Sequence, residues 1–284
     1  MTISFIIPSH NNAELLEKSL AGFAVQEHSG VQWEVFVIDN NSSDISIAAL
    51  QLKFRKHMKL TLIEQPQLAH PFALCRARNI GLKLAEGQWV VVMDADIIPN
   101  PKYIKSLAAY INEWKSKPII SSCERRFVLA NDIDAKSIID DPSILERLPV
   151  AKSPSNYGLP IDRRLPVMRH LPDIKHPWDY MHGCNVIFRK EDALKIGGYD
   201  EKYDGRWGFE DIDFAYRMIT EAECTPLYAS GLHVYHQDLP EDKSQTNRNA
   251  KSENPNWAKI CDLIPGYKEY KVAKYRKLSD SIEV

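Results

Sequence analysis

Short runs of β-branched and aromatic residues alternate with helical patterns along the N-terminal third of the chain, and this alternation constrains the fold most. The runs are ISFII (3–7), WEVFVID (33–39), KLTLIE (59–64) and WVVVM (89–93), and helices are expected after the polar SHNN, near 43–44, over 72–85 and from 101. Strands that are apolar on both faces and alternate with helices form a parallel sheet covered on both sides. The sequence therefore predicts an α/β fold.

Three polar clusters follow the predicted strands. They are Pro8-Ser9-His10-Asn11, Asp39-Asn40-Asn41 and Asp94-Ala95-Asp96. In sheets of this kind ligands bind outside the carboxyl ends of the strands. We therefore expect the three clusters to line one cleft.

The last cluster, Asp94 and Asp96, has two interpretations. Aspartate favours turns and helix caps, so the pair could simply end the strand before Ile97-Ile98-Pro99. The same Asp-x-Asp spacing also occurs at 132–134 and 211–213, so the tripeptide alone is not specific. Its position at the end of a buried strand favours a functional site.

The chain has no glycine-rich phosphate loop. The first predicted strand leads into PSHNN and not into G-x-G-x-x-G, and G-x-x-x-x-G-K-[ST] is absent. This argues against a nucleotide-sugar epimerase or dehydrogenase, which would need that glycine pattern for its dinucleotide. If a nucleotide binds, a divalent metal held by Asp96 would suit its diphosphate, because Mg²⁺ and Mn²⁺ prefer oxygen ligands. Such a metal would also stabilise a departing nucleoside diphosphate.

Composition limits the cellular setting and the partners. A net charge of −2 over 284 residues gives no general attraction to nucleic acid. The five scattered cysteines include no C-x-x-C pair, which is typical of reduced thiols in a cytosol. No apolar run approaches the roughly 20 residues that span a bilayer, and no basic leader precedes the first strand. We expect a cytoplasmic protein with at most peripheral contact at the inner face of a membrane.

Several longer motifs resemble one enzyme family. FIIPSHNN, VIDNNSSD and CRARNIGLKLAEGQWVVVMDAD resemble the inverting, family-two-like GT-A glycosyltransferases. GGYDEKYDGRWGFEDIDFAYRM (197–218) and YHQD (235–238) resemble the C-terminal region of galactosyl- and N-acetylgalactosaminyl-transferases, including bacterial chondroitin-type polymerases. The resemblance implies a GT-A fold, a Rossmann-like, mostly parallel sheet with helices on both faces and a C-terminal acceptor-binding extension. It implies one domain over 1–284, with a nucleotide-binding half (1–122), a variable insertion (123–174) and an acceptor-binding half (175–284).

The resemblance also assigns donor-binding roles. Asp39 matches the acidic residue that contacts the base, usually uracil, and Pro8 and Ser9 would line the same pocket. Arg78 matches a basic residue that approaches the diphosphate or the base, although a solvated helix arginine is the alternative. Gly183, before the apolar VIF, would let the backbone approach the donor sugar closely.

The implied metal site combines Asp96 with a histidine. Asp94 would lie near the ribose, and Asp96 would bind the metal. His236 in YHQD is the better match for the family's metal-binding histidine, and His233 is held in reserve. A nitrogen ligand shifts the expected ion from Mg²⁺ toward Mn²⁺.

The acceptor side is expected around an amphipathic helix that follows Trp207. Asp211 matches the family's general base and Glu210 the residue that holds the acceptor sugar, with the reverse order as the alternative. Helix capping is another explanation for these carboxylates. Trp207 offers a flat face for a sugar ring, although a tryptophan is more often part of a core.

Two segments remain. Residues 124–180 show poor periodicity and are expected to form a flexible insertion over the cleft. Its arginines Arg163, Arg164 and Arg169 are interpreted as solvated loop charges, with contact to an acidic acceptor as the alternative. The basic, aromatic piece at 267–277 is expected to be a surface helix, and the alternative is a helix lying on a membrane.

The sequence thus predicts a metal-dependent inverting glycosyltransferase. It would move a hexose or N-acetylhexosamine from a nucleotide diphosphate donor, UDP-linked by the resemblance, to a hydroxyl of a glycan or lipid-linked glycan. The alternative of another class is a non-catalytic nucleotide-sugar-binding scaffold of the same fold. The filled metal, base-contacting and general-base positions argue against it.

Overall fold

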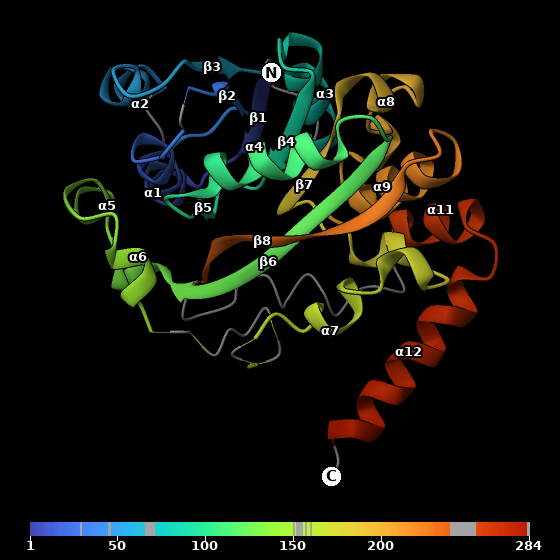
Figure 1. Ribbon diagram of the computed structural model, residues 1–284. Helices are drawn as coiled ribbons and strands as arrows, with labels where there is room; N and C mark the ends of the chain where they lie inside the picture. The colour runs from blue at the N-terminus through green and yellow to red at the C-terminus, as the bar shows by residue number, and fades with distance from the viewer. Residues whose placement is uncertain are drawn as a thin grey trace.

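A computed structural model describes residues 1–28, 30–44, 47–65, 72–149, 151, 156, 158–159, 161–238 and 254–282 of the chain. Its centre is one sheet with the strand order β3-β2-β1-β4-β7-β6-β8-β5 (Figure 1). The strands are β1 (Thr2–Ser9), β2 (Gln32–Asp39), β3 (Leu60–Glu64), β4 (Trp89–Met93), β5 (Ile97–Pro99), β6 (Ile119–Leu129), β7 (Asn185–Arg189) and β8 (Thr225–Asp238).

The two halves of the sheet differ in strand direction. β1 lies between β2 and β4 and is parallel to both, and β3 is parallel to β2. The predicted parallel sheet is confirmed for this half. β7 is antiparallel to β4 and β6, whereas the long strands β6 and β8 run parallel and side by side (Figure 1). The whole sheet is therefore mixed.

Helices cover both faces of the sheet. The described helices are α1 (Ala13–Ala24), α2 (Ile47–Phe54), α3 (Leu74–Leu84), α4 (Tyr103–Trp114), α5 (Ala135–Asp140), α6 (Ile144–Arg147), α7 (Leu165–Met168), α8 (Lys190–Lys195), α9 (Glu210–Thr220), α11 (Pro255–Leu263) and α12 (Tyr267–Ile282). Short 3-10 turns are η1 (Ala130–Asp132), η3 (Leu171–Asp173), η4 (Pro177–Tyr180) and η5 (Glu201–Tyr203). The four predicted helices of the N-terminal third correspond to α1–α4. The start expected near 43–44 falls just before α2, and residues 45–46 are outside the described residues.

Strand β4 shows why its sequence is apolar at every position. Val91 and Met93 belong to the core on one face of the sheet, beneath α1 and α4. Val90 and Val92 belong to the core on the other face, with α3 and α9. Because successive side chains of a strand point to opposite faces, a strand covered on both sides must be apolar throughout.

The segment 124–180 differs from the expected irregular insertion. Its first residues, 124–129, continue strand β6 across the expected boundary at 122, and short helices follow. Arg164 is only 1% exposed and pairs with Asp162 at 2.7 Å, so its interpretation as a solvated loop charge is wrong. Arg169 is exposed, as expected. Helices of four to six residues and buried ion pairs leave no periodic hydrophobic pattern, which is why the sequence suggested a loop.

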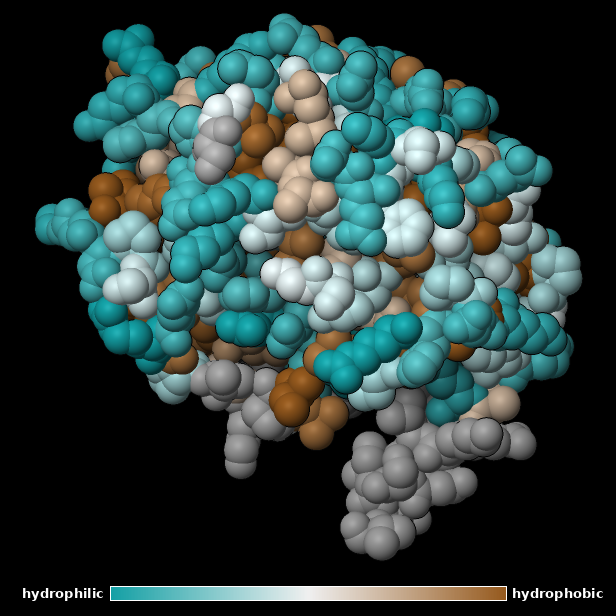
Figure 2. Space-filling view, in the orientation of Figure 1, coloured by the Kyte–Doolittle hydropathy of each residue, from teal (hydrophilic) through white to brown (hydrophobic). Residues whose placement is uncertain are grey.

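The C-terminal helix α12 includes the basic, aromatic piece. It extends from the body of the molecule to the C-terminus (Figure 1). Its residues Tyr267, Lys271 and Lys274 face inward and bind the buried carboxylate of Asp179. The face of the molecule in Figure 2 mixes hydrophilic and hydrophobic side chains. In the part of the chain that the structure describes, no helix has the length and apolar character needed to cross a membrane.

Candidate active site

The carboxyl ends of β1 and β2 bring the first two polar clusters together. Ser9 is the register partner of Asp39, so Pro8, Ser9 and Asp39 lie at the same edge of the sheet. The buried carboxylate of Asp39 accepts hydrogen bonds from the backbone N–H of Ser42 at 2.9 Å and from its hydroxyl at 2.5 Å. The hydroxyl of Ser9 is buried and has no hydrogen-bond partner among the described residues. Asp39 is thus held rigidly, and the nearby Ser9 hydroxyl can form a hydrogen bond with a ligand.

The third cluster forms a tight turn between β4 and β5. The N–H of Ile97 donates to the carbonyl of Asp94 at 3.2 Å, and the Ser19 hydroxyl on α1 donates to the carbonyl of Ala95 at 2.7 Å. Both side chains remain partly exposed. The turn interpretation is therefore correct for the backbone, and it holds both carboxylates at the edge of the sheet.

Asp96 lies beside His236 because β5 pairs with β8. Ile97 is the register partner of His236, and Oδ2 of Asp96 lies 3.6 Å from Nε2 of His236. The other ring nitrogen, Nδ1, lies 3.0 Å from Oδ1 of Asp238. Burial lowers the pKa of His236, but the carboxylates of Asp96 and Asp238 outweigh it and raise the pKa.

These two side chains fit a divalent cation. The Oδ1 atom of Asp96 is buried without a hydrogen-bond partner among the described residues, which is unfavourable unless something binds there. A ligating histidine commonly has a carboxylate beside its second nitrogen, and the carboxylate of Asp238 lies in that position beside Nδ1 of His236. Within the described ranges no group of three or more potential metal ligands gathers. Asp96 and His236 would thus leave most coordination positions to a bound substrate and water.

His233 does not share this site. It lies three residues before His236 in β8, and an odd separation places it on the opposite face of the strand. Its Nε2 lies 2.8 Å from the side-chain nitrogen of Asn100. Burial lowers the pKa of His233 to about 4, with a smaller contribution from Arg126. The arrangement favours His236 over the reserve.

Arg78 on α3 connects the two carboxylate motifs. It is 1% exposed, so the alternative of a solvated helix arginine is wrong. Its Nη2 lies 3.3 Å from Oδ1 of Asp94, and its Nη1 lies 3.2 Å from Oε1 of Glu210. The guanidinium also lies over the ring of Tyr199, 5.0 Å from its centroid. Burial lowers the pKa of Arg78, but Tyr199, Glu210 and Asp94 raise it overall, so the side chain stays charged.

Gly183 lies directly against this arginine. A Cβ atom at residue 183 would be 2.3 Å from Nη2 of Arg78, closer than real contacts allow. The N–H of Gly183 donates to Oδ2 of Asp211 at 3.2 Å. The glycine before β7 therefore leaves the space that Arg78 occupies and also holds Asp211.

Asp211 and Glu210 begin helix α9 but have different surroundings. Burial, reinforced by the neighbouring charge of Glu210, raises the pKa of Asp211 to about 7, although Arg78 and hydrogen bonds from Gly183 and Ile212 oppose this. Glu210 is buried and bound by Arg78. Asp211 is thus the carboxylate that can exchange a proton near neutral pH, whereas Glu210 is held in an ion pair.

The turn before α9 has an unusual backbone. Gly208 has φ +102°, and Phe209, which is not glycine, has φ +74°. Strained residues of this kind persist where the surroundings hold them and are common at functional sites. Phe209 packs on Trp257, with the ring centroids 5.5 Å apart. The Trp207 side chain is 49% exposed, so it is not a core tryptophan.

Two residues of the site were not predicted from the sequence. Asp238 faces the same way as His236, two residues earlier, and the strand period of YHQD contained this signal. Tyr199 lies beneath Arg78, and no local pattern in the sequence links two residues so far apart.

Comparison with known proteins identifies the class. Residues 4–157, more than half of the chain, match glycosyl transferase family 2, and the chain belongs to this family. Residues 163–235 match a second family, described as the N-terminal domain of galactosyltransferase. The family resemblance inferred from the motifs is confirmed, and the structure has the GT-A fold.

The individual relatives that follow have low sequence identity to this chain. Chondroitin synthase of Pasteurella multocida is 28% identical over 258 residues, which cover 87% of this chain and 26% of that protein. The chain thus spans about a quarter of the length of this relative. Staphylococcus aureus TarS residues 1–349 in complex with UDP-GlcNAc has a TM-score of 0.61 at 18% identity, with 87% of this chain and 61% of that one covered. The mannosyltransferase PcManGT from Pyrobaculum calidifontis, in complex with GDP-Man and Mn²⁺, has a TM-score of 0.60 at 19% identity, with 91% and 63% covered. These two structures share the fold.

Proposed function

We propose that this glycosyltransferase moves a hexose or N-acetylhexosamine from a UDP-linked donor to a hydroxyl of a glycan, with inversion at the anomeric carbon and with the help of a divalent metal. The observation that carries the proposal is the position of Arg78, which joins Asp94 at the end of β4 to Glu210 at the start of α9. This ion-pair network links the donor-side carboxylate of Asp94 to the start of α9, where the pKa of the neighbouring Asp211 is raised to about 7.

The donor would bind along the edge formed by β1, β2 and β4. Asp39 would accept a hydrogen bond from an N–H of the base, because its carboxylate is already oriented by Ser42. Pro8 and Ser9 would line the same pocket, and the Ser9 hydroxyl still lacks a partner among the described residues. Asp94 would lie near the ribose. Two proteins of the same fold were solved with nucleotide sugars, UDP-GlcNAc and GDP-Man, which supports a donor of this class.

Asp96 and His236 would hold the metal. When bound there, the ion would offset the negative charge that develops on the departing nucleoside diphosphate. The imidazole nitrogen favours Mn²⁺ over Mg²⁺. The mannosyltransferase of the same fold contains Mn²⁺, which supports this choice.

Asp211 would act as the general base. Its carboxylate would take the proton of the acceptor hydroxyl as that oxygen forms a bond to the anomeric carbon. The bond between this carbon and the diphosphate oxygen breaks on the opposite face, and the electron pair leaves with the diphosphate. Glu210, oriented by Arg78, would hold the acceptor sugar, and the exposed ring of Trp207 would pack against it. Gly183 would face the donor sugar.

The proposal is tested by thermal stabilisation with UDP-, GDP-, CMP- and dTDP-sugars, each with Mn²⁺ and with EDTA. We expect stabilisation by the UDP-sugars that depends on Mn²⁺. A product assay with the Asp211→Asn variant then separates an enzyme from a binding scaffold. Failure of all four donor classes to stabilise the protein in the presence of Mn²⁺ would contradict the proposal.

A further inference from the structure

The loop before helix α9 forms neither helix nor strand. It comprises residues 204–209, contains the exposed Trp207 and ends directly before the two carboxylates that begin α9. We call it the acceptor loop. Its backbone has positive φ angles at Gly205 (+94°), Gly208 (+102°) and Phe209 (+74°). A backbone of this kind keeps its shape only where its surroundings hold it.

Two asparagines at the start of α11 bind the backbone of this loop. Asn256 is 1% exposed, and its side-chain nitrogen donates hydrogen bonds to three carbonyls, those of Tyr203 (2.9 Å), Arg206 (3.1 Å) and Gly208 (3.2 Å). Its two N–H groups are shared among these three carbonyls. The side-chain nitrogen of Asn254 donates to the carbonyl of Trp207 at 2.8 Å. The two asparagines thus bind four carbonyls in or beside the acceptor loop, as a neighbouring strand would in a sheet.

Helix α11 also contacts the last residue of the loop. The ring of Trp257 lies 5.5 Å from the ring of Phe209, measured between centroids, and 6.0 Å from the ring of Tyr267 at the start of α12. Aromatic pairs at such distances are stabilising. The contact therefore supports the left-handed conformation of Phe209 at the point where α9 begins.

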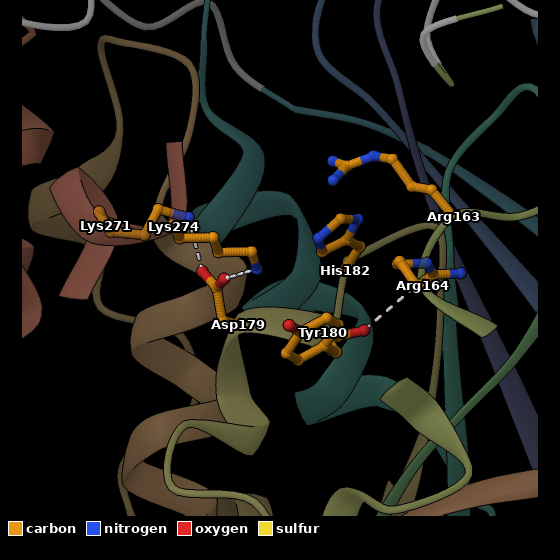
Figure 3. Close-up of a pocket in the computed structure, with 7 residues that line it drawn as sticks. All are labelled: Arg163, Arg164, Asp179, Tyr180, His182, Lys271 and Lys274. Atoms are coloured by element: carbon orange, nitrogen blue, oxygen red, sulfur yellow. Dashed lines mark hydrogen bonds and ion pairs between the residues drawn. The ribbon is translucent and has the colours of Figure 1, made fainter. Parts of the chain in front are cut away.

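Helix α12 holds a second segment that leads to the proposed general base. Figure 3 shows that Lys271 and Lys274 of α12 both bind the carboxylate of Asp179 in η4. Burial raises the pKa of Asp179, but the charges of the two lysines outweigh it and lower the pKa. Four residues after Asp179, the N–H of Gly183 donates to Oδ2 of Asp211. The C-terminal helices thus reach Asp211 from two sides.

We propose that the C-terminal segment 254–274 is part of the catalytic unit, and that Asn254 and Asn256 are positioning residues that hold the acceptor loop in the shape needed for transfer. This segment lies outside both stretches that match a family. The inference rests on the proposed glycosyltransfer and deepens it, because it assigns the placement of Trp207 and of the α9 carboxylates to α11. The alternative is that these contacts only stabilise the fold, and the two explanations predict different kinetics.

Asn254 allows the loop contact to be removed while the helix keeps its cap. Its Oδ1 accepts the N–H of Asn256 at 3.0 Å, whereas its nitrogen donates to Trp207. Asn254→Asp keeps the cap, because aspartate is an equally good N-cap residue, and removes the donor. We expect the KM for the acceptor to rise about fivefold, as the loss of one hydrogen bond would give. The melting temperature and the affinity for UDP with Mn²⁺ should stay close to those of the wild type.

Asn256→Ala removes all three loop contacts of Asn256. We expect kcat to fall at least about tenfold, because a small displacement of a reacting group is costly. The matched control is Gln26→Ala, which removes another buried amide. The Gln26 side chain bonds to three backbone groups just beyond the end of α1 that is remote from the site: the carbonyls of Gly22 (2.9 Å) and Asn100 (2.7 Å) and the N–H of Ile104 (3.0 Å). This control should lower the melting temperature and leave kcat unchanged.

Turnover is measured as UDP release from UDP-sugars with Mn²⁺, at a temperature at which every variant is folded. The acceptors are 4-nitrophenyl β-glycosides of hexoses and N-acetylhexosamines. Equal fractional losses of kcat in Asn256→Ala and Gln26→Ala would overturn the proposal. If Asn256→Ala does not fold, Asn254→Asp decides, and an acceptor KM equal to that of the wild type would overturn the proposal.

Hydrogen exchange, followed by mass spectrometry, tests the loop without turnover. The N–H of Gly205 donates to the carbonyl of Phe72 at 2.7 Å, and the N–H of Asp213 donates to the carbonyl of Phe209 at 2.9 Å. We expect both amides to exchange at least about tenfold faster in Asn256→Ala, because the loop opens more often, and at the wild-type rate in Gln26→Ala. Unchanged exchange in Asn256→Ala would contradict the role of α11. Failure of the wild type to bind any UDP-sugar would instead count against the proposed function, and the exchange rates would still show whether α11 holds the loop.

Discussion

A Cβ atom at Gly183 would lie 2.3 Å from Nη2 of Arg78, and the contact atom belongs to a fully buried guanidinium held by two carboxylates. Arg78 cannot move away without losing Asp94 or Glu210. We therefore expect Gly183→Ala to lower kcat by at least about tenfold through a displaced Arg78, and to reduce the melting temperature. Steady-state kinetics and thermal unfolding measure both effects.

The control for this variant is Gly87→Ala. A Cβ atom there would lie 2.6 Å from the Ser4 hydroxyl, at the opposite ends of β1 and β4 from the site. It should reduce the melting temperature and leave kcat of the folded enzyme unchanged. Equal losses of kcat in both variants would show that Gly183 matters only for stability.

Arg78 itself should be important for folding as well as for function. Arg78→Met leaves the buried carboxylate of Glu210 without its cation, and removal of one partner from a buried ion pair costs about 3 kcal/mol. Arg78→Lys keeps the charge but presents a single ammonium group, which cannot contact Asp94 and Glu210 in the same way. We expect the free energy of unfolding, measured with urea, to be highest for the wild type, lower for Arg78→Lys and lowest for Arg78→Met. A stability of Arg78→Met equal to that of the wild type would contradict the network.

Asp211→Asn should separate chemistry from donor binding. The amide keeps the shape of the side chain but cannot take a proton, so kcat should fall by about 10²–10⁴-fold. The UDP-sugar affinity, measured by calorimetry with Mn²⁺, should stay within about twofold. Glu210→Gln is the matched variant, and it should raise the acceptor KM more than it lowers kcat. The opposite ranking of the two variants would reverse the assigned roles.

The pH dependence of the reaction follows from the raised pKa of Asp211. Because burial and Glu210 raise it to about 7, the base form is present above this pH and is lost as the pH falls through it. We expect kcat to fall about tenfold per pH unit below this value.

The raised pKa of Asp211 also affects the stability of the protein. It makes the ionised Asp211 unfavourable for folding, since its pKa in the folded chain exceeds the ordinary value of 3.8. Asp211→Asn should therefore gain stability relative to the wild type as the pH rises from about 4 to 7, as thermal unfolding at several pH values would show.

Local sequence patterns were sufficient for the nucleotide-binding half of the fold. The run Trp89–Met93 is apolar at every position because both faces of β4 are covered, and a central strand in that setting needs this composition. The mixed half was not predictable in the same way. Strand β6 contains Glu124, Arg125 and Arg126 in its second part, and only its pairing with β8 makes this charged stretch a strand.

The candidate site shows the same division. The carboxylates at 94, 96, 210 and 211 could be singled out because each follows or begins an element that the sequence predicts. The contacts between them could not, since Arg78 reaches Glu210 across 132 positions of sequence and only the packed structure brings them together. Arg164 was interpreted as a solvated charge although Asp162 is only two residues away, because its contacts with the carbonyls of Cys123 and Tyr180, 41 and 16 positions away, exist only in the packed structure.

The two histidines of β8 offer a matched pair for the metal site. His236 lies 3.6 Å from Asp96, whereas His233 faces the other side of the strand and contacts Asn100. His236→Ala removes a proposed ligand, and since loss of even an outer-shell partner weakens metal binding by about 10–100-fold, the affinity for Mn²⁺ in the presence of UDP should fall at least as much. His233→Ala removes an equivalent ring from the same strand and should leave that affinity unchanged. Calorimetric titration of Mn²⁺ into each variant with UDP measures this, and an unchanged affinity in His236→Ala would remove His236 from the metal site.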